Sequence, residues 1–175
     1  IEAKVCEYIK YKPTNNLTFS PDGKALVGCE EGFGFAWVWS TETGKCIKKF
    51  ERSKKGFYSG SRVSDNDTFA FTRDGKYLLR ANKNYVEVVD VDTWNCVNTL
   101  TCHDPERSIT EISVSQDGRF FATSSHDKSV KVWSTSKWEL EKTFRGFYGV
   151  CSISFSPDGK RLVSRSSAGL SIWAL

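Results

Sequence analysis

The residues with the clearest potential for chemistry are the two histidines and six cysteines of this 175-residue chain. A histidine can serve as a general base or a metal ligand, and a cysteine as a nucleophile, a metal ligand or half of a disulfide. His126 stands beside Asp127 in an expected turn, where a contact role is more common than catalysis. Cys102 and His103 adjoin, but neighbouring side chains at a strand end point in different directions, which disfavours a shared metal.

The cysteines lack the spacing of a metal site, because no two of them form a CxxC pair. We expect free buried thiols in a reducing compartment rather than disulfides. The six positions are Cys6, Cys29, Cys46, Cys96, Cys102 and Cys151.

Signals of enzyme chemistry are also missing from the sequence. It contains no glycine-rich phosphate loop and no nucleophile elbow, and the stretch Gly32-Phe33-Gly34 is too short to cradle a phosphate. We therefore expect no enzymatic activity, no cofactor and no bound metal.

Composition and charge narrow the class of protein. Hydrophobic residues make up 39% of the chain and aromatic residues 14%, as in an ordinary folded domain. No stretch approaches the roughly 18 consecutive apolar residues of a membrane span, and no leader opens the chain, so we expect a soluble protein with no membrane insertion. The net charge of +4 is modest and permits an RNA contact without arguing for one.

One short turn occurs four times along the chain, at residues 19–23, 71–75, 114–118 and 155–159. Its Asp-Gly pairs lie 52, 43 and 41 residues apart, close to the roughly 40–45 residues of a propeller blade. Asp-Gly supplies the positive φ of a tight hairpin, and alternating apolar runs flank every copy. These runs predict second strands at 26–27, 77–79, 120–122 and 162–163, third strands at 36–39, 86–89, 130–133 and 170–173, and fourth strands at 46–50, 96–100 and 140–144.

Over essentially its whole length the chain resembles the WD-repeat β-propeller family. The resemblance implies one propeller region over residues 1–175, with repeats at about 1–40, 41–91, 92–134 and 135–175. The expected fold is all-β and built of four-stranded antiparallel blades. Four repeats make it a partial propeller or half of a larger ring.

The third repeat resembles the family best. In that family a loop His, a strand hydroxyl, a turn Asp and a strand Trp form a buried hydrogen-bonded set, which His103, Thr123, Asp127 and Trp133 match. The set is similar to part of a catalytic triad. Its Thr, however, is expected inside a strand and engaged in the network, which favours a structural role.

The other repeats depart from this pattern. Gly32, Asn84 and Ala168 stand where the third repeat has Asp127. In the second repeat Val89 replaces the Trp and Arg80 replaces the hydroxyl. We expect these blades to be tied together more weakly.

The resemblance further implies a docking rim, formed by the loops that join the second strand to the third and the fourth strand to the next first strand. Its exposed positions are expected at Asn15, Glu31, Asp65, Asp67, Lys83, Ser108, Thr110, His126, Cys151 and Ser167.

About ten extra residues lengthen the loop at 51–62 on the same rim. This loop combines basic and aromatic side chains, which suits acidic peptides or phosphate backbones with stacked bases. The alternative is a solvated loop whose aromatic residues fold back onto their own blade. The residues concerned are Arg52, Lys54, Lys55, Phe57, Tyr58 and Arg62.

The sequence therefore predicts a non-catalytic scaffold for protein-protein interaction, or a sensor module of a larger protein or complex. Its partners would be proteins or peptides, inside the cell, in the cytoplasm or the nucleus. The alternative function is a propeller that binds RNA or ribonucleoprotein through loop 51–62.

The two ends of the chain raise the question of closure. A lone strand is expected at 5–11, and the third strand at 170–173 is followed only by Ala174 and Leu175. We therefore expect the last sheet to lack an outer strand and to leave an open edge. Further blades of a parent chain are the favoured way to cover it, a head-to-tail pair of chains the second, and a four-blade ring the last.

Overall fold

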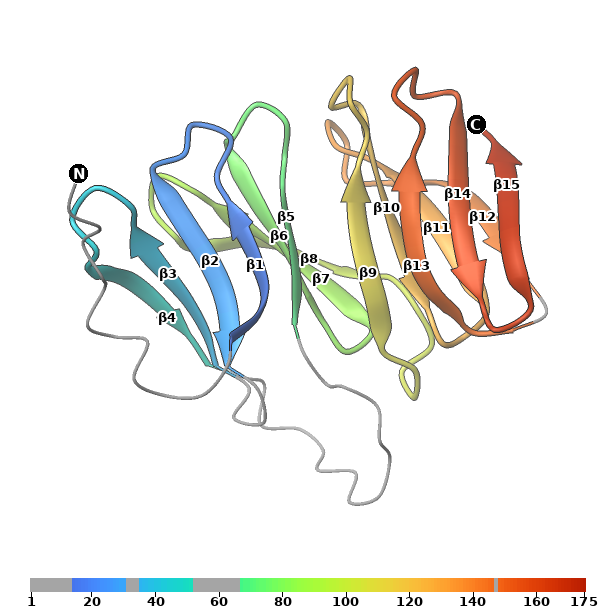
Figure 1. Ribbon diagram of the computed structural model, residues 1–175, viewed down its shortest axis with the longest axis horizontal. Coiled ribbons are helices and arrows are strands. Elements are labelled where there is room, and N and C mark those ends of the chain that lie inside the picture. The colour runs from blue at the N-terminus through green and yellow to red at the C-terminus, as the bar shows by residue number, and fades with distance from the viewer. Residues whose placement is uncertain (1–13, 31–34, 52–66, 147) are drawn as a thin grey trace. The chain divides into compact units, whose positions relative to one another are not determined.

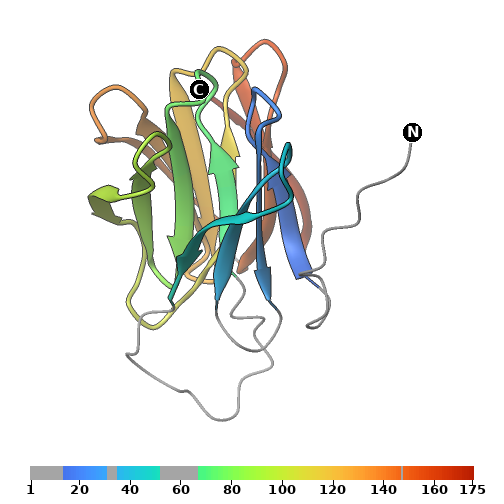
Figure 2. The ribbon, with the colours of Figure 1, turned by 90° about the vertical axis from the view of Figure 1, so that its left-hand side faces the viewer.

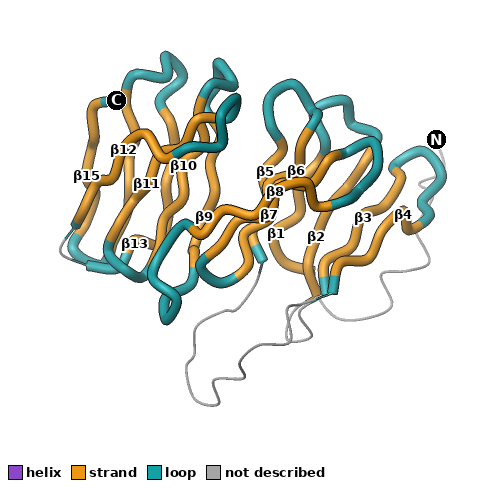
Figure 3. The backbone as a smooth tube through the Cα atoms, turned by 180° about the vertical axis from the view of Figure 1, so that it is seen from behind, coloured by secondary structure: helices purple, strands orange, loops and turns teal. Residues whose placement is uncertain are grey.

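The computed structural model describes residues 14–30, 35–51, 67–146 and 148–175. Every regular element in these ranges is a β-strand, and Figure 3 shows strands and loops only. The all-β prediction is confirmed. The described residues include no helix that is long and apolar enough to cross a membrane. The strand expected at 5–11 lies outside the described residues.

The chain divides into two compact units, residues 1–67 and 68–175. The described part of the first unit is one antiparallel sheet in the order β1-β2-β3-β4, which Figure 2 shows in blue to cyan. Val27 and Val38 pair across β2 and β3 and are fully buried. The strands are β1 (Thr14–Phe19), β2 (Ala25–Glu30), β3 (Ala36–Ser40) and β4 (Cys46–Phe50).

The second unit contains three antiparallel sheets. Within each sheet, strands that are consecutive in the sequence pair as hairpins. The second sheet consists of β5 (Thr68–Phe71), β6 (Tyr77–Asn82), β7 (Tyr85–Asp90) and β8 (Cys96–Thr101). The third consists of β9 (Ile109–Val114), β10 (Phe120–Ser125), β11 (Ser129–Ser134) and β12 (Leu140–Arg145). The fourth has three strands, β13 (Val150–Phe155), β14 (Arg161–Ser166) and β15 (Gly169–Ala174).

The same local chemistry closes the first hairpin of every sheet. In the third sheet the Ser115 hydroxyl donates to Asp117 Oδ1 at 2.7 Å, and Gly118 follows with a φ of 72°. The hydroxyl also accepts the N–H of Phe120, which starts the next strand. Ser20, Thr72 and Ser156 make the equivalent bond to an aspartate two residues later, at 2.5–2.7 Å. Glycine is required at the last turn position because its φ is positive.

Two apolar clusters hold the sheets of the second unit together. One contains Leu79 and Val88 from the second sheet with Ile112 and Phe121 from the third. The other contains side chains from the third and fourth sheets. β9, the first strand of the third sheet, contacts both β5 and β13, the first strands of its neighbours. The three sheets of this unit therefore stack with their first strands adjacent, as the blades of a propeller do.

The sheets and the predicted repeats are offset by one strand. The repeat predicted at 92–134 contains β8, the outer strand of the second sheet, and then β9 to β11 of the third. The repeat boundaries themselves stay a prediction. The expectation that the last sheet lacks an outer strand is confirmed for the described residues, since β15 has only β14 as a neighbour.

Candidate functional site

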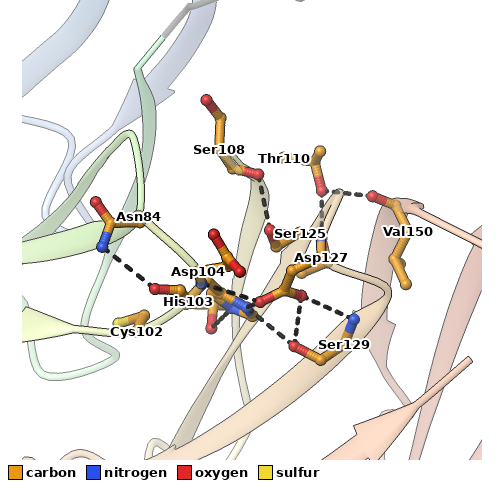
Figure 4. A network of polar contacts seen from close by, with 12 residues as sticks. Asn84, Cys102, His103, Asp104, Ser108, Thr110, Ser125, Asp127, Ser129 and Val150 are labelled. Carbon is orange, nitrogen blue, oxygen red and sulfur yellow. Dashed lines mark hydrogen bonds and ion pairs between the residues drawn. The ribbon is translucent and has the colours of Figure 1, made fainter. Parts of the chain in front are cut away.

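The best-defined polar site joins the second sheet (β5–β8) to the third sheet (β9–β12), both in the second unit (Figure 4). His103 lies in the loop between β8 and β9, Thr123 on β10, Asp127 in the β10–β11 turn and Trp133 on β11. His103 Nδ1 lies 2.9 Å from Asp127 Oδ2, and its Nε2 lies 2.8 Å from Thr123 Oγ1. Trp133 Nε1 donates to the same Thr123 Oγ1 at 3.1 Å.

The direction of these hydrogen bonds follows from the groups present. The Asp127 carboxylate only accepts, so His103 Nδ1 carries a proton and donates to it. The indole N–H of Trp133 only donates, so Thr123 Oγ1 accepts from Trp133 and donates its own proton to His103 Nε2. A neutral His103 thus completes a run of hydrogen bonds from Trp133 through Thr123 and His103 to Asp127, in which each of these donors has an acceptor.

Asp127 gathers three further donors. Its Oδ1 accepts the Ser129 hydroxyl at 2.6 Å and the Ser129 N–H at 2.9 Å, and its Oδ2 accepts the Asp104 N–H at 3.2 Å. Ser129 was not among the residues that the sequence predicted for this set. The local signal for it was the Asp-x-Ser spacing at 127–129, in which an aspartate caps the backbone two residues later.

Burial and hydrogen bonding act in opposite directions on these groups. Burial favours a raised pKa for Asp127, but the bonds from Ser129 and the contact with His103 outweigh it and lower the pKa of the carboxyl to about 2. Burial lowers the pKa of His103, and the attraction of Asp127 opposes this shift only in part. His103 is therefore neutral near pH 7, in agreement with the donor pattern.

The set resembles a catalytic triad in composition but not in access. Thr123 is fully buried, and its hydroxyl is engaged by both His103 and Trp133. A substrate cannot reach this oxygen. What the arrangement does is fix the β8–β9 loop and the β10–β11 turn against the sheet.

The neighbouring sheets use parts of the pattern or replace it. In the fourth sheet Trp173 Nε1 donates to Ser164 Oγ at 2.9 Å. In the second sheet Arg80, at the position of the hydroxyl, is buried and pairs with Glu87 at 3.0 Å. Asn84, at the position of Asp127, donates from its amide to the His103 carbonyl at 3.2 Å.

The rim positions predicted in the second unit lie in its loops, with different exposure. Cys151 and Ser167 are exposed, whereas Lys83, Ser108 and His126 are half-buried. Thr110 was predicted to be an exposed contact residue, but it is half-buried. Its hydroxyl donates to the Val150 carbonyl at 2.8 Å and contacts Ser124 Oγ, so it links the third and fourth sheets.

The prediction that Asp67 is exposed is wrong, because only 5% of this residue is accessible. Its carbonyl accepts hydrogen bonds from Asn16 Nδ2 and Cys29 Sγ, which hold it against the first sheet. Asn15 lies in β1, but its side chain is outside what the structure describes. The remaining predicted positions fall outside the described residues: Glu31, Gly32, Arg52, Lys54, Lys55, Phe57, Tyr58, Arg62 and Asp65.

The cysteines are free thiols at every described position. The prediction that they are buried holds for Cys29 and Cys102 and is wrong for Cys46, Cys96 and Cys151. Cys46 and Cys96 begin β4 and β8, the outermost strands of their sheets, where no neighbouring strand covers them. Among the described residues no group of His, Cys, Asp and Glu side chains could hold a metal ion.

Comparison with known proteins identifies relatives of this chain. The family described as "WD domain, G-beta repeat" matches residues 94–134 and 138–173. Apoptotic protease-activating factor 1 of Rattus norvegicus is 26% identical over 168 residues, which cover 93% of this chain and 12% of that protein. Target of rapamycin complex subunit LST8 of Saccharomyces cerevisiae is 25% identical over 126 residues, 72% of this chain and 39% of that protein.

Solved structures give the same result for the fold. The structure of U3-55K superposes with a TM-score of 0.74 at 20% identity, over 93% of this chain and 49% of that one. The WD40 repeats of RRP9 superpose with a TM-score of 0.75 at 19% identity, over 93% and 48%. The chain thus spans less than half the length of each of these proteins. Residues 94–134 and 138–173 are therefore WD repeats, and with its repeated turns and antiparallel sheets the chain has the fold of the WD-repeat β-propellers.

Proposed function

We propose that this chain is a non-catalytic scaffold that binds a protein or peptide partner through the loops on one side of its second unit. We call this surface the loop rim and define it by residues 83–84, 102–108, 126–128, 146, 148–149 and 167–168, with the adjoining Cys151. The observation that carries the proposal is that hydrogen bonds join the β6–β7, β8–β9, β10–β11 and β12–β13 connections to one another across the sheets.

These bonds connect the loop rim at several points. The Lys83 carbonyl accepts the N–H of Ile109 at 2.6 Å, which joins the β6–β7 turn to β9. The Ser108 carbonyl accepts from Ser125 Oγ at 3.0 Å and from the His126 N–H at 3.3 Å, which joins the β8–β9 loop to the β10–β11 turn. Loops fixed in this way lose little conformational entropy on binding, which favours affinity.

The exposed side chains of the loop rim suit a protein partner. Tyr148 is 53% exposed in the β12–β13 loop, Arg107 is exposed in the β8–β9 loop, and Lys128 is exposed in the β10–β11 turn. Tyrosine and arginine are the side chains most enriched at protein interfaces.

The names of the relatives support a role in assemblies. One is a subunit of the target of rapamycin complex, and another, 33% identical over 79 residues, is a guanine nucleotide-binding protein subunit beta of Schizosaccharomyces pombe. By this likeness we propose a place within a larger complex, in the cytoplasm or the nucleus.

The test is affinity capture of cellular partners with the wild-type chain and with a Tyr148→Ala, Arg107→Glu variant. We expect the variant to lose partners that survive nuclease treatment, with an unchanged melting temperature, because exposed substitutions change stability by about 0.5 kcal/mol or less. Lys142→Ala on the outer strand β12 is the matched control and should keep them. Replacing Lys54, Lys55 and Arg62 by Glu should weaken the same binding.

Two results would contradict the proposal. Partners that all disappear on nuclease treatment would favour RNA binding over protein docking. Partners retained by the loop-rim variant but lost by Lys142→Ala would place the docking surface on the outer strands.

A further inference from the structure

A groove opens between the second sheet (β5–β8) and the third sheet (β9–β12), at the strand ends that lie opposite the loop rim. Its volume is about 580 Å³. The β5–β6, β9–β10 and β11–β12 turns form its walls. The β5–β6 and β9–β10 turns lie at the upper side of Figure 1, away from the β8–β9 loop of the loop rim. The groove is therefore a surface distinct from the one proposed above. Its lining is Thr72, Arg73, Asp74, Lys76, Tyr77, Asp117, Gly118, Thr135, Ser136 and Trp138.

The charges in the groove are unequally satisfied. Asp74 accepts the Thr72 hydroxyl at 2.7 Å and lies 4.0 Å from Lys76 Nζ. Asp117 accepts from Ser115 Oγ at 2.7 Å and from Arg119 Nε at 2.7 Å. Both carboxylates thus have partners within their own turns.

Among the described residues that line the groove, Arg73 is a cation for which no partner is found. Within the described part of the chain its guanidinium makes no hydrogen bond and no ion pair. Its stem extends from the second sheet toward the third, because a Cβ on Gly118 would lie only 3.0 Å from the Arg73 Cβ. Because Gly118 has no side chain, the stem of Arg73 fits beside the β9–β10 turn. One positive charge is therefore available to a ligand.

The aromatic wall of the groove rests on an unusual backbone. Trp138 has a φ of 58°, in the left-handed region that bulky residues rarely adopt. At the same position of the β3–β4 turn the first sheet has Gly44, with a φ of 68°. Glycine would hold the Trp138 turn without strain, so the distinct contribution of Trp138 is its ring. That ring packs edge to face on Tyr77, with centroids 5.3 Å apart.

The turns themselves do not require these residues. Arg73 stands at the turn position that Pro21, Gln116 and Pro157 hold in the other three hairpins. Proline and glutamine hold the same turn without bringing a charge. The unpaired guanidinium of Arg73 and the ring of Trp138 both line this groove.

From this juxtaposition we propose that the groove binds an acidic linear segment of a partner protein. A carboxylate of the segment pairs with Arg73, and a neighbouring apolar side chain packs on Trp138 and Tyr77. Guanidinium groups bind carboxylates through two parallel hydrogen bonds, and aromatic walls add contact area at low entropic cost. Because one guanidinium is available and the carboxylates of Asp74 and Asp117 flank it, the groove suits a single carboxylate and not a run of negative charges, which disfavours a nucleic-acid backbone.

The experiment measures the fluorescence anisotropy of a short fluorescein-labelled peptide, in which one glutamate stands beside a Leu-Phe pair, as the 175-residue chain is added. The same peptide with glutamine in place of glutamate is the ligand control. We expect Arg73→Gln to weaken binding of the acidic peptide about tenfold, the scale of one charge-assisted hydrogen bond. Trp138→Gly should weaken it to a similar extent, whereas the glutamine peptide should bind the wild-type chain as weakly as the acidic peptide binds Arg73→Gln.

The matched protein control is Trp94→Gly. Trp94 holds the same left-handed position in the β7–β8 turn, with a φ of 55°, and does not line the groove. It should leave peptide binding unchanged. Equal binding of the two peptides, or an unchanged affinity in Arg73→Gln, would overturn the proposal. Tighter binding of a single-stranded DNA oligonucleotide than of the acidic peptide would also overturn it. The loop-rim variant should bind the peptide normally, so failure at one surface leaves the other in place.

Discussion

The third and fourth sheets have nearly the same strand pattern but differ in what covers them. On β11, Val130 and Val132 are 1% and 2% exposed, because Val150, Ile153 and Leu162 of the fourth sheet pack on them. On β15, Leu170 and Ile172 hold the corresponding places before Trp173 and are 73% and 72% exposed. The burial of such a strand is thus decided by the next sheet and not by its own sequence.

The polar groups differ in the same way. In the third sheet Trp133 and Thr123 belong to a network that reaches His103 and Asp127. In the fourth sheet Trp173 donates to Ser164, and no further side chain joins this pair among the residues that the structure describes. Both Trp rings stack on a Phe, but Trp133 stacks on Phe121 of its own sheet and Trp173 stacks on Phe144 of the third sheet. A strand hydroxyl and a Trp therefore suffice for the pair, and the loop histidine adds the connection to the preceding sheet.

The sharpest way to break this comparison is to place a charge at the two equivalent apolar positions. Val132→Asp should destabilise the chain by about 3 kcal/mol or more, because an unpaired carboxylate enters the core. Ile172→Asp should change stability by only about 0.5 kcal/mol, because its site is open. Urea unfolding followed by circular dichroism measures both. An Ile172→Asp variant as unstable as Val132→Asp would show that the β15 face is covered in solution.

A smaller effect is expected from the turn aspartate. Asp127→Ala should lower the free energy of unfolding by about 1–3 kcal/mol, because it leaves buried donors on His103 and Ser129 without an acceptor. Ala168→Asp, the reverse change in the fourth sheet, should give no comparable gain, because residue 168 is exposed. The melting temperatures of the two variants test this. An unchanged midpoint for Asp127→Ala would show that the network does not form in solution.

Much of the fold could be predicted from the sequence, because strand formation follows a local pattern. The burial of each strand could not be predicted in this way. The apolar alternation at 130–133 and 170–173 predicted β11 and β15 equally well, since pairing depends on local pattern. It could not predict that one strand is buried and the other exposed, because burial depends on contacts far along the chain. His103, Thr123, Asp127 and Trp133 were identifiable by resemblance, whereas Ser129 was not.

The groove could not be predicted from the sequence, because neither Trp138 nor Arg73 carries a local signal for it. A turn position with positive φ is expected to hold glycine, as Gly44 does, and Trp138 gives no signal that it adopts the same conformation. Arg73 likewise looks like an ordinary exposed turn residue in the sequence. Only the structure shows that Gly118 leaves room for it at the edge of a groove.

The smallest expected effect is a pH dependence of stability, which tells whether burial or the attraction of Asp127 dominates the pKa of His103. The fourth sheet has no histidine at this place. Burial lowers the pKa of His103 below its ordinary value of 6.5, so the unfolded chain takes up a proton at higher pH than the folded chain does. Stability from this group is complete above about pH 7 and falls as the pH drops through 6.5 toward the folded pKa. Asp127, with a pKa of about 2 against 3.8, keeps its contribution until the pH falls below about 4. Urea midpoints between pH 7.5 and pH 5 should therefore decrease for the wild-type chain, and the gap to His103→Gln should narrow over the same range. A gap that widens as the pH falls would mean that the folded chain protonates His103 more readily than the unfolded chain, so that the attraction of Asp127 outweighs burial.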